Sequence, residues 1–162
     1  MANKVKPLIK GSEIPDFQTV DDLGEKFSKQ NLLGTRYLLY FYPKDNTPGC
    51  SNQACGFRDL FQEFKQLNVS ILGISGGNQV SHQKFRQKFQ LPFPLLIDED
   101  FAIAKKFGVF GEKKFMGKTF QGVHRISFLI GKNGTVESVY DKVKSKTHPF
   151  EVLEIISKNL ES

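Results

Sequence analysis

The chain has 162 residues, which is the length of one ordinary globular domain. A domain of this size buries roughly 70% of the surface of its unfolded chain, so it forms a core without disulfide or metal cross-links. Apolar residues make up 39% of the chain and charged residues 25%, which excludes a disordered or collagen-like protein. The apolar runs are far shorter than the ~20 residues that cross a bilayer. We expect one domain over residues 1–162 and no membrane partner.

The net charge of +6 is scattered along the chain, which favours a basic soluble surface over a nucleic-acid interface. The N-terminus lacks the apolar core and cleavage site of a secretory signal, so the expected location is the cytoplasm. In that reducing compartment the two cysteines, five residues apart, are expected to be reactive rather than structural.

The first half of the chain predicts alternating strands and helices. Residues 11–24 read as a short strand, a turn and a second strand, and the apolar runs 36–42 and 69–75 read as buried strands. From Cys55 onward, apolar residues recur at the spacing of one amphipathic helix up to Leu67.

The second half continues this alternation. A helix is expected over 78–90, a short strand over 95–98 and a short helix over 100–107. Residues 109–122 read as a loop with at most a short strand. A hairpin of strands 125–130 and 135–140 and a helix over 149–160 close the chain. This order predicts an α/β fold, with a central mixed sheet flanked by helices and an N-terminal β-hairpin.

Cys50 lies between a buried strand and a helix, in the segment Pro43-Lys-Asp-Asn-Thr-Pro-Gly-Cys50. A thiol at a helix N-terminus loses its proton more easily, and the thiolate is the nucleophile. Pro48 keeps Thr47 extended, and Gly49 lets the backbone approach a small substrate. The Thr47 hydroxyl is expected to bond both to the sulfur and to a substrate oxygen.

Cys55 follows five residues later. On a regular α-helix the two cysteine Cα atoms would lie ~8.7 Å apart, whereas a disulfide wants ~4.4–6.8 Å. A disulfide between them therefore requires the first turn or two of the helix to unwind. Ser51, Asn52 and Gly56 are poor helix formers, so we predict a conformational switch coupled to oxidation.

Two further readings of these residues are possible. A zinc site is disfavoured because it needs four ligands, and the three histidines are widely separated in sequence. A Cys–His hydrolase pairing Cys50 with His124 is conceivable, but no third residue or oxyanion hole is evident. No metal or cofactor is expected. Arg125 opens a strand, and a guanidinium beside a thiolate would favour its charged form and donate to a peroxide oxygen.

Residues 43–50 match the Pro-x-x-x-Thr/Ser-x-x-Cys motif, and this stretch followed by Cys55 resembles peroxiredoxins of the Q type, also called bacterioferritin comigratory proteins. The resemblance extends to Gly11–Phe17, Phe93–Asp98 and Val123–Ile130, so it covers nearly the whole chain. It implies a thioredoxin-like fold.

The resemblance also implies a role for each candidate residue. Cys50 would be the peroxidatic cysteine and Cys55 the resolving one, while Pro43 would shield the sulfur and Thr47 and Arg125 would align the peroxide. The substrates would be hydrogen peroxide and alkyl hydroperoxides, and the reductant thioredoxin or a related dithiol.

One departure concerns Gln53, where such proteins often carry glutamate, because an amide supplies no negative charge. Both cysteines lie in one chain, so we expect a monomer. The alternatives are a thioredoxin-like disulfide oxidoreductase or a peroxide-sensing redox protein, and, from another class, a basic binding protein without catalysis. The first would normally use Cys-x-x-Cys, which this chain lacks.

Overall fold

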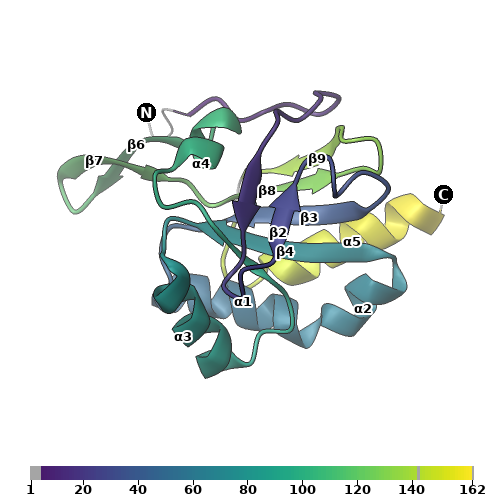
Figure 1. Cartoon of the computed structure of the whole chain (residues 1–162), viewed down its shortest axis with the longest axis horizontal. Coiled ribbons are helices and arrows are strands. Elements are labelled where there is room, and N and C mark those ends of the chain that lie inside the picture. Colours follow the sequence, from purple (N-terminus) through teal and green to yellow (C-terminus); the bar gives the residue numbers. More distant parts are fainter. Residues whose placement is uncertain (1–4, 142, 162) are drawn as a thin grey trace.

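The computed structural model describes residues 5–141 and 143–161, with side chains up to residue 158. Five strands form a central mixed sheet in the order β5-β4-β3-β8-β9 (Figure 1). Strands β3, β4 and β5 are parallel, whereas β8 runs antiparallel to both of its neighbours, β3 and β9. The strands are β3 Arg36–Phe41, β4 Val69–Ser75, β5 Leu95–Ile97, β8 Ile126–Ile130 and β9 Val136–Tyr140. The expected α/β fold with a central mixed sheet is confirmed.

Both faces of the sheet are buried, which explains the near-continuous apolar runs of β3 and β4. Along β3, Leu38 and Tyr40 pack in one core with side chains of α1, α3 and α5, whereas Leu39 and Phe41 pack in a second core with residues of α4 and the N-terminal stretch. The helices are α1 Pro48–Asp59, α2 Phe61–Gln66, α3 Gln79–Phe89, α4 Ala102–Lys106 and α5 His148–Glu161.

The prediction of one continuous helix from Cys55 to Leu67 is wrong. Leu60 has a non-helical backbone (φ −102°, ψ 9°) and separates α1 from α2. The Leu60 N–H still bonds Gly56, and its carbonyl still accepts from Phe64, so the interruption is one residue wide. The helical spacing of apolar residues continues across Leu60, so the sequence pattern shows no break there.

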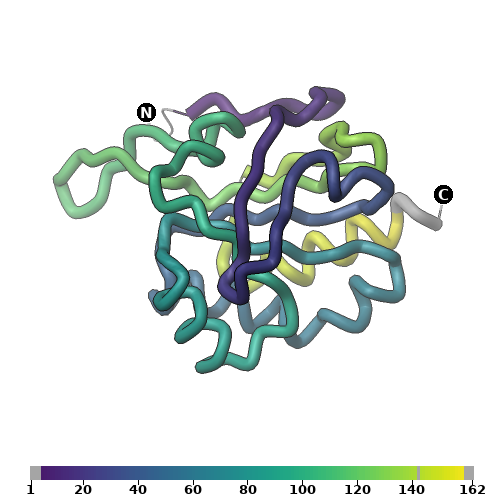
Figure 2. Tube along the Cα trace, in the orientation of Figure 1, coloured from purple at the N-terminus to yellow at the C-terminus, as the bar shows by residue number. Residues whose placement is uncertain are grey.

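The N-terminal hairpin is present as β1 Gln18–Val20 paired with β2 Lys26–Ser28. The N-terminal stretch up to Asp21, which includes β1, passes across the sheet, as the purple tube in Figure 2 shows. Glu13 forms a bridge with Thr135 just before β9, and Asp21 forms one with Leu96 of β5. This stretch therefore reaches both outer strands of the sheet.

The loop predicted over 109–122 is wrong. Residues there form a second hairpin, β6 Phe110–Phe115 with β7 Lys118–Val123, which projects from the body of the molecule (Figure 1). Its turn residues, Met116 and Gly117, both have positive φ (50° and 78°), as a two-residue primed turn requires. The strands mix polar residues with glycine and phenylalanine, and few of their positions are buried, so no apolar alternation marked them.

Candidate active site

Cys50 is the third residue of α1, close behind the end of β3. Thr47 precedes the helix with extended backbone (φ −95°, ψ 155°), and Pro48 occupies the first turn, where its missing N–H costs no helical bond. The Cys50 side chain is only 1% exposed and lies in the core shared by Tyr40 and α1. Cys50 therefore lies in the first turn of α1, where N–H groups lack partners within the helix and favour negative charge.

Arg125 immediately precedes β8 and reaches α1 with both ends of its guanidinium. Nη2 donates to Cys50 Sγ at 3.3 Å, and Nη1 donates to Gln53 Oε1 at 2.7 Å. A side chain at Gly49 would place its Cβ 3.1 Å from Arg125 Nη2, so glycine gives the guanidinium room beside the sulfur. The structure therefore brings together Cys50 and Arg125, which are 75 residues apart in sequence.

Gln53 is fully buried and belongs to the same cluster. Its oxygen accepts from Arg125, but its Nε2 is buried without a hydrogen-bond partner among the described residues. The Tyr40 hydroxyl in the same core is also buried and unpartnered within the described part of the chain. Burial, and after it the charge of Cys50, raise the pKa of Tyr40 well above its ordinary value, so its hydroxyl keeps its proton. Sequence reasoning noted Gln53 only as a departure from relatives and missed its contact with Arg125.

Lys113 of β6 is a second cation near the site that sequence reasoning missed. Its Nζ donates to the Val123 carbonyl at 2.9 Å, two residues before Arg125. Burial lowers the pKa of Lys113, the charge of Arg125 lowers it further, and Cys50 acts in the opposite sense. No sequence pattern pointed to this lysine, because it lies in the stretch that reads as a loop.

Thr47 and Pro43 lie in the segment between β3 and α1, and both are half-buried. The Thr47 hydroxyl donates to the Lys44 carbonyl at 3.1 Å, and its lone pairs are left to accept. Its expected bond to the sulfur is not among the hydrogen bonds of the described residues, so that contact stays a prediction.

Cys55 lies on the same helix as Cys50, is partly exposed, and both thiols are free. The helix is regular across both positions. The two sulfurs therefore cannot bond until the helix opens, as the spacing predicts.

Other readings of the site find little support in the structure. His124 directs Nε2 to the Glu112 carbonyl at 3.0 Å, and burial lowers its pKa; no hydrogen bond links it to Cys50 among the described residues. The described residues hold no cluster of three or more metal-ligating side chains. None of their helices is both long and apolar enough to span a membrane.

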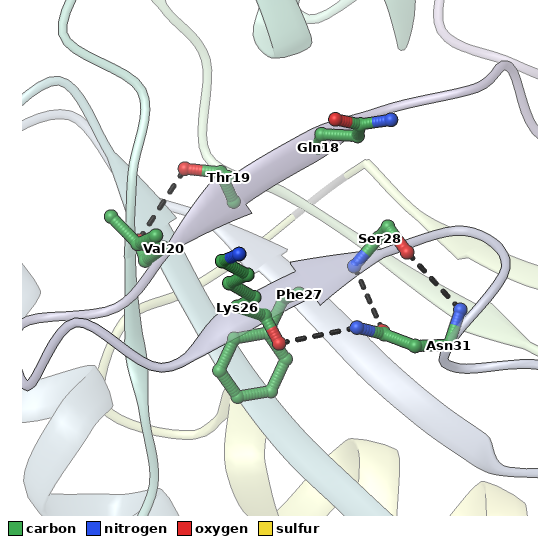
Figure 3. A pocket seen from close by; sticks show the side chains of 7 residues that line it. All are labelled: Gln18, Thr19, Val20, Lys26, Phe27, Ser28 and Asn31. Atoms are coloured by element: carbon green, nitrogen blue, oxygen red, sulfur yellow. Dashed lines mark hydrogen bonds between the residues drawn. The ribbon is translucent and has the colours of Figure 1, made fainter.

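A surface hollow of about 440 Å³ lies over the β1–β2 hairpin (Figure 3). Its lining is mostly polar, with Val20 and Phe27 as its apolar members, and Asn31 there bonds Ser28 and the Lys26 carbonyl. It includes neither cysteine nor Arg125, so the chemistry does not lie there. The residues that line it are Gln18, Thr19, Val20, Lys26, Phe27, Ser28 and Asn31.

The chemistry that the Cys50 cluster supports follows from these contacts. A thiolate at this position lies in the first turn of α1 and accepts from Arg125, and both features stabilise negative charge. The same guanidinium is placed to donate to an oxygen that gains charge as it leaves an attacked O–O bond.

Known proteins resemble this chain over most of its length. Residues 10–139 match the AhpC/TSA family. The chain is 46% identical to peroxiredoxin Bcp of Escherichia coli K12 over 144 residues, which is 89% of this chain and 92% of that protein. It is 41% identical to peroxiredoxin Bcp of Bacillus subtilis over 146 residues, with coverage of 90% and 93%.

Solved structures of similar proteins share the fold of this chain. A cysteine-to-serine mutant of PrxQ from Xylella fastidiosa superposes with a TM-score of 0.89 at 30% identity, covering 96% of this chain and 99% of that one. A bacterioferritin comigratory protein of Xanthomonas campestris, described in terms of alkyl peroxide reduction, gives a TM-score of 0.85 at 30% identity, with coverage of 95% and 99%. The expected thioredoxin-like fold is confirmed.

Proposed function

The chain belongs to the AhpC/TSA family as a peroxiredoxin of the Bcp and PrxQ kind, and from this premise we propose that it reduces hydrogen peroxide and alkyl hydroperoxides through Cys50. The observation that carries the assignment of the attacking residue is the 3.3 Å bond from Arg125 Nη2 to Cys50 Sγ at the start of α1. Thr47 and Pro43 precede Cys50 in the same short segment. Thr47 would hold the peroxide, and Pro43 would exclude water.

In the first step the Cys50 thiolate attacks one peroxide oxygen. An S–O bond forms and the O–O bond breaks, so sulfur is oxidised to sulfenic acid while the leaving oxygen takes a proton and departs as water or an alcohol. Arg125 stabilises the charge that develops on that leaving oxygen.

In the second step the Cys55 thiolate attacks the Cys50 sulfenic sulfur: an S–S bond forms, the S–O bond breaks, and the departing hydroxide takes a proton from solvent and leaves as water. The product is an intramolecular disulfide. This step needs α1 to unwind between the two cysteines. A dithiol reductant, thioredoxin or a relative, then returns both residues to thiols by exchange. Because both cysteines belong to one chain, we propose that the monomer turns over, in the reducing cytoplasm.

The test adds one equivalent of hydrogen peroxide to the reduced protein and maps its thiols by mass spectrometry. We expect a Cys50–Cys55 disulfide, and NADPH oxidation when thioredoxin and its reductase are added. Cys50→Ser should abolish peroxide consumption, whereas Cys55→Ser should consume about one equivalent and then stall. Recovery of both thiols intact after peroxide would refute the mechanism.

A further inference from the structure

Asp45 is a buried carboxylate in the segment between Pro43 and Thr47. It is 8% exposed and accepts three hydrogen bonds: from the Tyr42 hydroxyl at 2.6 Å, the Ser81 hydroxyl at 2.7 Å and His82 Nδ1 at 2.6 Å. Burial by itself raises the pKa of Asp45, but the bonds and charge of His82 with the other donors hold it below its ordinary value. The carboxylate is therefore ionised.

His82 of α3 is fully buried, and both of its ring nitrogens face acceptors. Nε2 lies 2.8 Å from the Leu96 carbonyl of β5, and a carbonyl oxygen only accepts, so this nitrogen carries hydrogen. Nδ1 lies 2.6 Å from Asp45 Oδ2. The ring thus joins Asp45 of the segment before α1 to the Leu96 carbonyl of β5, and Asp45 and His82 form a buried pair.

The backbone at Gly77 lies against the Asp45–His82 pair. A Cβ there would lie 2.5 Å from Asp45 Oδ2 and 2.9 Å from His82 Nδ1, so the residue fits only without a side chain. A buried pair that includes a charged group adds little net stability, because desolvation offsets the attraction. What it does supply is a fixed direction for each group, since a misplaced partner would leave a buried charge unpaired.

We propose that Asp45 and His82 are positioning residues for the peroxide reaction: their buried pair fastens residues 43–47 to α3 and β5. Asp45 lies two residues after Pro43 and two before Thr47, so this attachment fixes the segment that carries both of them. The pair bonds neither the sulfur nor Arg125 and acts through the segment that it holds. The proposal rests on the peroxidase activity of Cys50 and not on disulfide formation.

The first test compares two buried aspartates. Asp45→Asn removes the charge from the pair, whereas Asp98→Asn weakens a matched carboxylate, 4% exposed, that accepts from the Ile103 and Ala104 N–H groups at the start of α4. The rate of Cys50 oxidation by hydrogen peroxide is followed by rapid mixing, alkylation and mass spectrometry. We expect at least about a tenfold fall for Asp45→Asn and less than about a twofold change for Asp98→Asn, because small misplacements of reacting groups are costly. Equal effects of the two variants on this rate would overturn the proposal.

A double-mutant cycle tests whether the two residues act as a unit. His82→Gln alone should slow Cys50 oxidation about as much as Asp45→Asn, and the double variant should be no slower than either single variant. Additive losses would contradict a shared role. If Cys50 of the wild type is oxidised normally but no Cys50–Cys55 disulfide forms, the proposed disulfide step fails while this comparison still stands.

The protonation state of His82 can be read in the wild-type protein, independently of any variant. Nitrogen-15 NMR of the histidine rings near neutral pH should show that His82 carries hydrogen on Nε2. A His82 ring without hydrogen on Nε2 would overturn its bond to β5 and with it the proposal.

Discussion

Arg125 and Gln53 are joined by a 2.7 Å hydrogen bond that leaves the second guanidinium nitrogen of Arg125 on Cys50 Sγ. The amide holds the arginine by one end, and the arginine meets the sulfur with the other. Bonding Gln53 and Cys50 at the same time requires a planar side chain with two parallel donors, which lysine does not provide.

Arg125→Lys should therefore lower the rate of Cys50 oxidation although it keeps the positive charge. We expect a loss on the order of 100-fold, the size seen when one donor to a developing oxyanion is removed. The matched control is Arg58→Lys, because Arg58 also lies at α1 but bonds Asp59 and the Phe89 carbonyl. Rates of peroxide consumption measure both, and a small effect at Arg125 would argue against its role.

Gln53→Glu should change how the reaction depends on pH. A buried carboxylate at this position would pair with Arg125 and place negative charge near the sulfur, which disfavours the thiolate. We expect the rising limb of the pH–rate profile to move to higher pH by about one unit. Gln53→Met is the control, since it removes the bond to Arg125 without adding charge. Identical limbs for the two variants would show that charge is not the cause.

Gly56→Ala should destabilise the protein even though alanine favours helices. Its Cβ would lie 2.7 Å from Pro149 Cγ, at the start of α5, and a proline ring has little freedom to move aside. The gain of about 1 kcal/mol in helix propensity is opposed by an overpacking cost of about 1–3 kcal/mol. Urea unfolding followed by circular dichroism should show a net loss, whereas the exposed Asn52→Ala in the same helix should show none. A Gly56→Ala variant as stable as the wild type would contradict this packing.

His148 should make folding stability depend on pH. Burial, with a contribution from the charge of Arg125, lowers the pKa of His148 to about 4, and its Nε2 meets the Ser127 hydroxyl at 2.9 Å. The unfolded chain binds a proton on this ring below a pH of about 6.5, so the native state loses stability as the pH falls from there toward 4. Stability falls toward low pH because the native state buries the His148 ring in its neutral form, whereas the unfolded chain protonates it.

The expected loss is about 2 kcal/mol in the free energy of unfolding between pH 7 and pH 5. His148→Gln has no titrating ring and should lose about that much less over the same interval. Urea unfolding of the two proteins at both pH values measures the difference. Parallel losses in the two proteins would assign the pH dependence to other groups.

The parts of the site that lie close together in sequence were predictable from it. Cys50, Thr47 and Pro43 share one short segment between a strand and a helix, and a helix start has known effects on a thiol. The buried strands β3 and β4 were predictable because their apolar runs are bounded by turn residues.

The remaining parts depend on contacts between distant segments. Arg125 meets Gln53 only because β8 pairs with β3 and brings the end of the sheet over α1. The pair of Asp45 and His82 joins residues 37 apart in sequence, with no local pattern to link them. The β6–β7 hairpin escaped detection because its strands pair through backbone bonds while few of their positions are buried.

The N-terminal stretch of the chain has a consequence for association between molecules. It bonds Val136 of β9 through Gly11 and Ser12, and it meets Leu96 of β5 through Asp21. Outer strands carry unpaired backbone groups that recruit strands from other chains. Because a single stretch covers part of both outer strands, its detachment would uncover both together. A chain opened in this way could add a neighbour on each side, so the resulting aggregates would grow as open-ended filaments rather than stop at pairs.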